Sequence, residues 1–466
     1  MAQHSFIKFY RYLRIALQGS ETNFTTGSIR RAIFLLSVPM VLEMVMESLF
    51  AVVDIFFVGR VGVHAVATVG LTESVLTIIY SIAIGLSMAA TATVARRVGE
   101  KRPELAADAA FQAIVIAIGL SLVIALVGGF FARDILRLMG GEPALVEEGV
   151  GYTRLMLAGN TSVMLLFLIN GIFRGAGNAS LAMRSLWIAN GLNILLDPLF
   201  IFGWGPVPAF GVTGAAIATT IGRSVGVAYQ SYHLFGGRAL VRVGYANLVL
   251  RADTLLRLLK IASGSMGQFL VESASWIFLI RIIAAFGSEA LAGYTIAVRI
   301  IIFSILPSWG LANAAATLVG QNLGAGHPLR AEKSVWQTAF YNLLFLLGLS
   351  VVFYMAAYPI VRLFSDDPVV IEQGAKALRI ICVGYAFVSY GMVVGQSFNG
   401  AGDTRTPLFI NLGCYWALQI PLAYFLAVPL GWGPTGVYVA VALTFAVAAV
   451  VSVLLFRRGR WKTARV

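Results

Sequence analysis

The stretch Ile33–Val58, which reads IFLLSVPMVLEMVMESLFAVVDIFFV, decides the class of the fold. It is apolar almost from end to end, and its charged residues are the acids Glu43, Glu47 and Asp54. A helix needs about 20 mostly apolar residues to cross the hydrocarbon core of a bilayer, and this run is longer than that. We therefore predict that it forms a transmembrane helix.

The whole chain has the same character as this stretch. Of its 466 residues, 59% are hydrophobic and only 12% are charged, whereas soluble domains carry about 25% charged residues. A soluble fold of this composition would expose large apolar patches and aggregate. The apolar residues suffice for roughly a dozen spans. The chain is therefore expected to be an all-α polytopic membrane protein.

Apolar runs between polar segments predict twelve transmembrane helices. Their approximate cores are 33–58, 65–94, 107–131, 152–173, 181–203, 211–234, 256–285, 290–319, 335–357, 376–398, 406–428 and 435–456. An even number of spans places both termini on one side of the membrane, and most of the 34 Lys and Arg residues fall in the tails and loops of that side. Because basic residues concentrate in cytoplasmic loops, we expect a plasma (inner) membrane protein with both termini in the cytoplasm.

The spans divide the chain into five predicted segments. These are a cytoplasmic tail (1–31), an N-lobe of six spans (32–235), a cytoplasmic linker (236–255), a C-lobe of six spans (256–457) and a basic tail (458–466). In the first tail, cations alternate with apolar residues at helical spacing between His4 and Gln18. That pattern indicates either an amphipathic helix on the membrane surface or a disordered tail. The net charge of +13 lies mainly in loops and tails, so we expect no nucleic-acid partner.

A shift of 225 residues aligns the second half of the sequence with the first. VARRVG at 94–99 falls on VGQNLG at 319–324, and FRGAG at 173–177 falls on FNGAG at 398–402. Each repeat contains six spans, so we expect two pseudo-symmetric lobes with the same orientation. Repeated lobes around a midplane site are a common plan of secondary transporters. A duplicated scaffold without a transport role is the alternative.

Six carboxylates fall inside the predicted spans, where an ionisable group costs at least about 2.5–3.5 kcal/mol. They are Glu43, Glu47, Asp54, Glu73, Asp197 and Glu272. Glu43, Glu47 and Asp54 share one face of the first helix, while Asn193 and Asp197 lie one turn apart on the fifth. If these faces meet, the N-lobe encloses a pocket with two aspartates and at least one asparagine amide.

Such a pocket suits a monovalent cation. Carboxyl groups removed from water hold a proton more readily, and paired carboxylate oxygens are also ligands for Na+. Release of one cation to admit another gives antiport. A static hydrogen-bonded helix pair is the alternative for Asp54 and Asp197, and Glu43 is either inside the cavity or solvated near the interface. Structural ion pairs are expected for the remaining in-span charges, Glu73, Arg223, Arg281 and Arg299.

The sequence offers no pattern typical of an enzyme. It contains neither a GxxxxGK[ST] phosphate-binding loop nor an HExxH zinc motif, and its four histidines are scattered. The two cysteines, Cys382 and Cys414, lie in separate apolar segments, where a small buried hydrophobe is the expected state. We expect neither catalysis nor a cofactor.

Several motifs taken together resemble the multidrug and toxic compound extrusion (MATE) family over nearly the full chain. They are Pro39, VDIFFVGR at 53–60, RGAGN at 174–178, NILLDP at 193–198, GVTGAAIAT at 211–219, GQNLG at 320–324 and NGAGDTR at 399–405. The resemblance implies a V-shaped pair of six-helix lobes. It also implies efflux of organic cations or amphipathic drugs coupled to H+ or Na+.

The resemblance further implies a first-lobe cation site. Its residues match Asp54, Asn193, Asp197 and Thr219, with Phe50 in place of a tyrosine one turn before the first aspartate. A bound Na+ would be held by Asp54, Asn193 and Asp197.

A second-lobe site is implied only in part. Its glutamate matches Glu272, whereas the position of its partner aspartate falls at Val388. Glu47 is the repeat counterpart of Glu272, so we expect Glu43, Glu47 and Glu272 to line the cavity of both lobes.

We therefore expect a cation-coupled antiporter. Protonation or Na+ binding at Asp54 and Asp197 would bend the first helix at a Pro39 hinge and switch the facing of the cavity. We expect a monomer that works among membrane lipids. The nearest alternative is a flippase for lipids or lipid-linked precursors, which a lateral groove and a strongly cationic cavity would favour. An ion channel is a remoter alternative.

Overall fold

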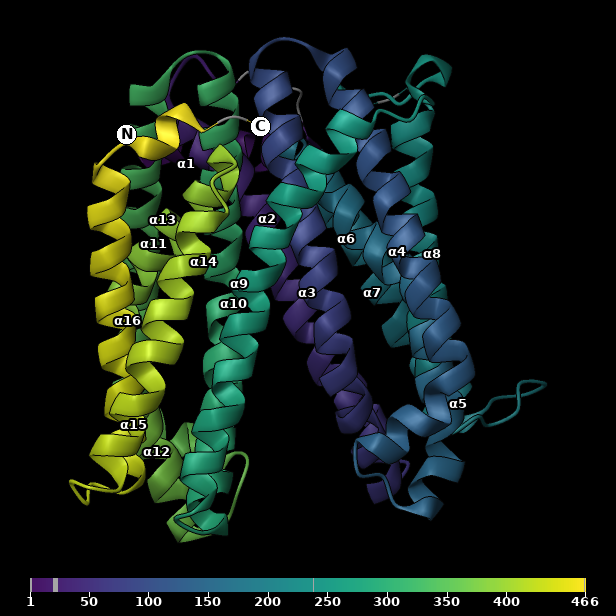
Figure 1. The fold of residues 1–466 in the computed structure, drawn as a ribbon, viewed down its shortest axis with the longest axis vertical. Helices are drawn as coiled ribbons and strands as arrows, with labels where there is room; N and C mark the ends of the chain where they lie inside the picture. The colour runs from purple at the N-terminus through teal and green to yellow at the C-terminus, as the bar shows by residue number, and fades with distance from the viewer. Residues whose placement is uncertain (1, 20–23, 238, 465) are drawn as a thin grey trace.

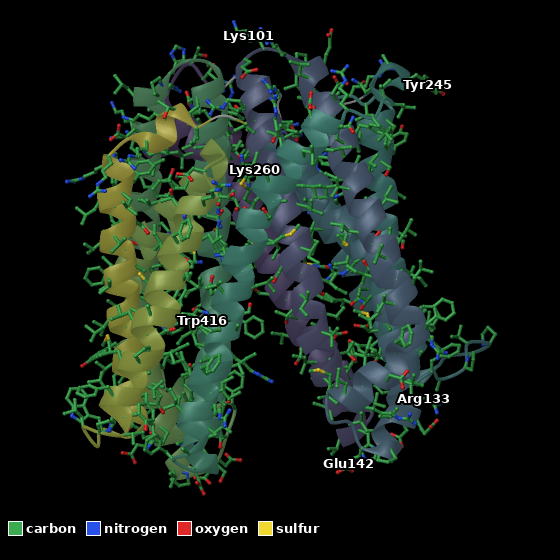
Figure 2. The ribbon with its side chains drawn as sticks, in the orientation of Figure 1. Lys101, Arg133, Glu142, Tyr245, Lys260 and Trp416 are labelled. Carbon is green, nitrogen blue, oxygen red and sulfur yellow. The ribbon has the colours of Figure 1, made fainter. Side chains whose placement is uncertain are left out.

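The computed structural model describes residues 2–19, 24–237, 239–464 and 466, with side chains from Tyr10 onward. The described chain forms two helical bundles that meet at one end and diverge toward the other, which gives a V in side view (Figure 1). Both chain termini lie where the bundles meet, and we call this the terminal end (Figure 1). Arg133 and Glu142 lie at the opposite end (Figure 2).

The N-lobe is built from seven described helices. They are α2 (Ile29–Gly59), α3 (Val63–Gly99), α4 (Pro103–Leu138), α5 (Pro143–Ala158), α6 (Asn160–Gly175), α7 (Ala179–Phe202) and α8 (Val212–Phe235). The helix expected between His4 and Gln18 is present as α1 (Ala2–Gln18), although the side chains of residues 2–9 lie outside the described part. The linker contains the short helix η1 (Tyr245–Asn247) and is tied to α4, because Arg251 pairs with Asp108 at 3.0 Å.

The C-lobe repeats this arrangement and adds a wide helical segment. Its helices are α9 (Ala252–Ala284), α10 (Ser288–Gly324), α11 (Pro328–Arg362), α12 (Pro368–Val383), α13 (Tyr385–Ala401), α14 (Arg405–Asn411), the π-helix η2 (Leu412–Gln419), α15 (Ile420–Ala427) and α16 (Pro434–Arg457). The tail ends in the short helix η3 (Arg460–Thr463).

The twelve predicted spans all correspond to helices or helix pairs of the described chain. Nine helical stretches are long and apolar enough to cross a membrane, and the pair α12 and α13, bent by 56°, makes a tenth. Helices α2 and α8, which carry in-span charges, complete the twelve. The all-α fold of two six-span lobes is thus confirmed.

The two lobes break and end their helices at equivalent positions. Gly159 separates α5 from α6, and its repeat counterpart Gly384 separates α12 from α13. Gly177 and Gly402, again counterparts, have φ angles of 87° and 89°, a left-handed conformation that glycine adopts without strain. The repeat seen in the sequence is therefore a repeat of backbone geometry.

The lobes meet through close backbone contacts at glycines. A Cβ atom on Gly99 would collide with the carbonyl of Gln321, and one on its counterpart Gly324 would collide with the carbonyl of Arg96. Further from the terminal end, a Cβ on Gly310 would lie 2.7 Å from the backbone of Met40. Small residues let membrane helices approach closely, so these glycines allow α3 and α2 of one lobe to pack on α10 of the other.

Both tails pack across this meeting point. Arg184 of α7 donates a hydrogen bond to the carbonyl of Leu17 at 2.7 Å, while Arg330 of α11 donates to the carbonyl of Gly27 at 2.9 Å. At the other end of the chain, Trp461 is fully buried, and Arg96 donates to the carbonyl of Ala464 at 2.7 Å. The tails therefore connect the two lobes at the terminal end.

Four prolines lie within long helices of the described chain, in α2, α7, α10 and α11. Pro39 lies inside α2 and Pro198 inside α7, and both helices continue through them. A different proline accompanies a sharper distortion, because Ala356 of α11 has non-helical angles three residues before Pro359. A proline removes one backbone donor and crowds the preceding turn, which explains the kink in α11.

Candidate functional site

The predicted N-lobe site brings α7 and α8 together. Asn193 of α7 donates a hydrogen bond from Nδ2 to Oγ1 of Thr219 on α8 at 2.9 Å, and both residues are buried. Asp197, one turn further along α7, is fully buried. Within the described chain, both of its carboxylate oxygens and Oδ1 of Asn193 lack a hydrogen-bond partner. The pocket thus presents three buried oxygen acceptors, with the Asn193 amide as the side-chain donor beside Asp197.

Asp54 of α2 completes this group. Its charge acts on that of Asp197, and it is itself within the field of Glu73 and Arg223. The Asp54 side chain is half-buried, and no hydrogen bond or ion pair ties it to another described residue. Asn193, Asp197 and Thr219 therefore lie on the paired helices α7 and α8, and the charge of Asp54 on α2 acts on this group. Carboxylate and amide oxygens are hard donors, so this set fits a bound Na+ and fits a proton equally well.

Glu47 lines the central cavity, and its carboxylate is paired. Its Oε1 lies 3.6 Å from Nη2 of Arg223 on α8, and its Oε2 accepts a hydrogen bond from Asn190 at 2.8 Å. The Arg223 guanidinium lies over the rings of Phe50 and Phe167, at 5.5 and 5.8 Å. The ion pair expected for Arg223 is thus present, and it neutralises Glu47.

Glu43 is also paired, through a residue just beyond the predicted span 152–173. Arg174 lies inside α6, buried, with Nη1 3.5 Å from Oε1 of Glu43. Asn170, one turn earlier on α6, donates to the same oxygen at 3.0 Å, and Gln230 donates to Asn170 at 2.6 Å. Solvation of Glu43 near the interface is therefore ruled out in this conformation, because the residue belongs to a buried polar network.

The other in-span charges differ from expectation. Glu73, Arg281 and Arg299 are exposed, and no ion pair within 4 Å joins any of them to the described residues. The charge of Arg299 nevertheless acts on Glu73. Glu73 lies on α3 and Arg299 on α10, so these two side chains belong to opposite lobes. Because the lobes diverge, the Glu73 and Arg299 side chains do not come within ion-pair distance.

A central cavity of about 180 Å³ lies between the lobes. It is bordered by α2, α3, α6 and α7 of the N-lobe and by α10 and α13 of the C-lobe. Its polar lining includes Glu43, Glu47, Ser87, Thr91, Arg174, Asn313, Gln396 and Asn399. Because the two glutamates are both paired with arginines, this cavity has little net charge.

A larger cavity of about 420 Å³ lies in the C-lobe. It shares four residues with the central cavity, namely Leu306, Trp309, Gln396 and Asn399, so the two hollows adjoin. Aromatic side chains of Phe269, Trp276, Trp309, Tyr415 and Phe445 line it, together with Val388. Glu272 also lines this cavity, and the described chain offers its carboxylate neither an ion pair nor a hydrogen bond.

The repeat explains why Glu272 is free while Glu47 is paired. The counterpart of Arg223 is Ala448 and that of Asn190 is Tyr415, and both of these C-lobe residues line the cavity. An alanine in place of an arginine removes the cation and leaves space. The buried Glu43–Arg174 pair changes in the same way, because its C-lobe counterparts are Gln268 and Asn399, whose amides bond at 3.0 Å.

Several of these residues carry no conspicuous signal in the sequence. Arg174 stands just beyond the predicted span 152–173, beside Gly175 and Gly177, and Trp276 and Trp309 are two apolar residues among many in their predicted spans. A comparison of the two repeats at each in-span charge could have found the imbalance at Glu272. No simple sequence signal predicts which aromatic residues face the cavity.

Comparison with known proteins agrees with this architecture. The MatE family model matches the chain twice, at residues 39–199 and 265–425, once in each half. The chain is 25% identical to a probable multidrug resistance protein NorM of Thermotoga maritima over 434 residues, which cover 93% of each chain. It is 26% identical to an FAD transporter of Shewanella oneidensis, covering 85% of this chain and 88% of the relative.

A solved structure shows the same fold. It is described as the outward-facing conformation of a multidrug resistance MATE family transporter of the MOP superfamily. The two chains share 28% sequence identity with a TM-score of 0.89, over 95% of this chain and 98% of the other. Since the family model covers most of both repeats and the fold agrees over the full length, the chain belongs to the MATE family of membrane transporters.

Proposed function

We propose that the protein is a secondary antiporter that exports organic cations or amphipathic drugs in exchange for H+ or Na+. The observation that carries this proposal is the pair Asp54 and Asp197, two in-span carboxylates whose charges interact and for which the described chain offers no cationic partner in an ion pair. A charged group inside a membrane span is costly and usually functional. A static helix pair would tie both carboxylates to protein donors, whereas Asp197 has the Asn193 amide beside it and Asp54 has no hydrogen bond to a described residue.

The coupling cation binds at Asp54 and Asp197 in this proposal. Asn193 contributes its free Oδ1, while Thr219 orients the Asn193 amide by accepting its Nδ2 hydrogen. A proton neutralises one carboxyl group, whereas Na+ joins both aspartates to the amide oxygen. In either case binding removes the repulsion between the aspartates, and release restores it.

The transported compound binds in the adjoining cavities. Glu272 supplies an unpaired negative charge, and Trp276 and Trp309 supply aromatic surface beside it. A cation over an aromatic ring is stabilised by about 0.5–2 kcal/mol, more when water is excluded. This combination favours a cargo that carries both a positive charge and an apolar body.

Alternating access follows from how the lobes meet. In this conformation the lobes are closed at the terminal end and apart at the other (Figure 1). With both termini in the cytoplasm of a plasma membrane protein, the V opens to the outside. Helix α2 carries Asp54 and packs on α10 beside Pro39. A bend at Pro39 would therefore move the coupling site and the lobe contact together, with a monomer as the working unit.

Efflux from proteoliposomes tests the coupling assignment. A fluorescent organic cation is loaded, and a pH gradient or a Na+ gradient is imposed without a membrane potential. We expect one gradient to drive uphill efflux, and Asp54→Asn and Asp197→Asn each to reduce the driven rate at least tenfold. The matched control is Asp134→Asn, an exposed aspartate at the far end of α4. Wild-type rates in both site variants would refute the assignment.

The substrate assignment has its own test. Glu272→Gln should weaken binding of a cationic probe at least tenfold while leaving binding of a neutral analogue nearly unchanged. Equal loss for both probes would mean that Glu272 acts through the fold and not as a counter-ion. A relative bears the name FAD transporter, so anionic probes belong in the same screen.

The rival functions are less well supported by the site. A flippase for anionic lipid headgroups calls for a cationic cavity, and both arginines near the central cavity are paired with glutamates. Lipid scrambling without drug efflux would nevertheless decide for that alternative. An ion channel would give single-channel currents, and uphill efflux would exclude it.

A further inference from the structure

A third hollow lies on the outer face of the C-lobe, where it shares Ile410 with the larger cavity. Its volume is about 550 Å³, and α13, α14, η2 and α16 border it. That volume lies within the range of about 300–1,000 Å³ that is usual for small-molecule sites. Buried Phe398, Ile410 and Cys414 form its floor, while Val447 and Val451 form part of one wall. We call this hollow the outer groove.

The outer groove is a hollow between α14, η2 and α16, and η2 packs on both α9 and α16. Trp416 of η2 donates its indole hydrogen to the carbonyl of Val271 at 2.9 Å, which holds the segment against α9 (Figure 2). On the groove side, Gly413 has no side chain, and a Cβ added there would meet no atom within 4 Å. A π-helical turn is rare and often marks a functional site. Here it widens the helix beside an open apolar space.

The outer groove is about one leaflet deep. Helix α16 runs toward the terminal end, and its residues from Val447 to Arg458 border the groove. At 1.5 Å per residue this segment is about 16 Å long, which is close to half of the roughly 30 Å hydrocarbon core of a bilayer. The apolar floor therefore extends from the interface to about the middle of the membrane.

Two free cations lie at the interfacial end of the outer groove. Arg458 and Arg460 are exposed, and their guanidinium groups form no ion pair or hydrogen bond with the described residues. The nearby Lys462 is engaged by Glu332 at 2.6 Å. Asp403, at the same mouth, is occupied by hydrogen bonds from Thr406, the shorter of them 2.6 Å. The unused guanidinium groups match the geometry of a phosphate, which they bind through paired N–H donors.

We propose that the outer groove binds an anionic phospholipid. One acyl chain lies along Ile410, Cys414 and Val451, and Arg458 and Arg460 hold the headgroup phosphate. A phospholipid has both a phosphate for the two cations and an acyl chain for the apolar floor, which is one leaflet deep. A water-soluble anion has no part that matches the apolar floor. Basic pockets between membrane helices commonly bind anionic headgroups. The bound lipid fills the hollow that α14, η2 and α16 leave between them.

Native mass spectrometry of the purified full chain tests the headgroup contact. The protein is titrated with phosphatidylglycerol, with phosphatidylcholine, and with phosphatidylglycerol in the presence of inorganic phosphate. We expect phosphatidylglycerol to bind more tightly than phosphatidylcholine, and Arg458→Gln/Arg460→Gln to weaken its binding roughly tenfold or more. The control Arg102→Gln/Lys333→Gln removes the same charge from exposed positions near the terminal end and should bind as the wild type does.

Filling the outer groove tests the acyl-chain contact separately. Gly413→Phe places a ring in the open space and should abolish tight phosphatidylglycerol binding. Gly348→Phe is the matched control, because Gly348 on α11 is equally exposed and a Cβ there also meets no atom within 4 Å. Unchanged binding in Gly413→Phe would overturn the proposal. So would equal affinity for the two lipids, or full displacement of phosphatidylglycerol by inorganic phosphate at matched concentration, which would indicate a site for free anions.

Discussion

The Glu47–Arg223 pair gives a prediction whose size follows from the structure. Arg223 is 2% exposed, and its guanidinium lies 3.6 Å from the Glu47 carboxylate. Removal of one partner from a buried ion pair costs about 3–5 kcal/mol, because the other charge is left uncompensated. Glu47 keeps the hydrogen bond from Asn190 at 2.8 Å and is partly exposed. We therefore expect Arg223→Met to lower the free energy of unfolding by about 3 kcal/mol, the lower end of that range.

The double variant Glu47→Gln/Arg223→Met separates charge from packing. Replacing both partners by uncharged residues of similar volume is often neutral, so most of the lost stability should return. Thermal unfolding of the detergent-purified protein measures all four members of the cycle, and the difference gives the coupling energy. Arg281→Met is the matched control, since this in-span arginine is exposed and unpaired among the described residues. It should change stability by no more than about 0.5 kcal/mol.

Two results would refute this reasoning. One is an Arg223→Met variant that unfolds at the wild-type temperature. The other is a double variant whose destabilisation equals the sum of the single effects, because the two groups would then not be coupled. The C-lobe already contains the uncoupled arrangement, with Ala448 in place of the arginine and Glu272 facing a cavity. The double-mutant cycle therefore measures the coupling energy that the C-lobe lacks at the equivalent positions.

Three further predictions concern the lobe contacts and the buried C-terminal tail. Gly99→Leu introduces a side chain where even a Cβ collides with the facing helix, so it should shift the protein away from this conformation. The measurement is the distance between spin labels on the two lobes, and Gly119→Leu, whose side chain enters open space, should leave that distance unchanged. Trp461→Ala removes a fully buried ring stacked at 4.5 Å on a neighbouring phenylalanine, and thermal unfolding should show a loss of about 3–5 kcal/mol. Glu73 and Arg299 should form an ion pair when the lobes close at the open end. Glu73→Lys should therefore slow transport, and the double variant Glu73→Lys/Arg299→Glu should restore the rate. A double variant as slow as Glu73→Lys would show that the two charges never meet.

The sequence predicted the fold well because its signals are local. Twenty apolar residues in succession satisfy the bilayer wherever they stand in the fold, and the helix ends at Gly177 and Gly402, with φ angles of 87° and 89°, use the backbone freedom of glycine. The repeat shift of 225 residues needed only the alignment of one half with the other. Asp54 and Asp197 could be singled out because a charge in a span is conspicuous without knowledge of its partners.

The partners of the in-span charges were decided by the tertiary structure alone. Whether a carboxylate is free depends on which side chain of another helix lies within about 4 Å, and no local pattern contains that distance. Glu47 and Glu272 occupy equivalent positions, yet Arg223 neutralises the first and Ala448 leaves the second facing a cavity. For the same reason, the sequence does not show that Arg174, just beyond the predicted span 152–173, pairs with Glu43 inside the protein.

The sequence by itself thus determined the membrane class, the twelve helices, the duplication and the set of residues that need an explanation. The tertiary structure decided which of those residues are neutralised, where the cavities lie and how the tails join the lobes. The division has a physical basis. Hydropathy and backbone propensity act over one helix, whereas charge compensation and packing act between helices that are distant along the chain.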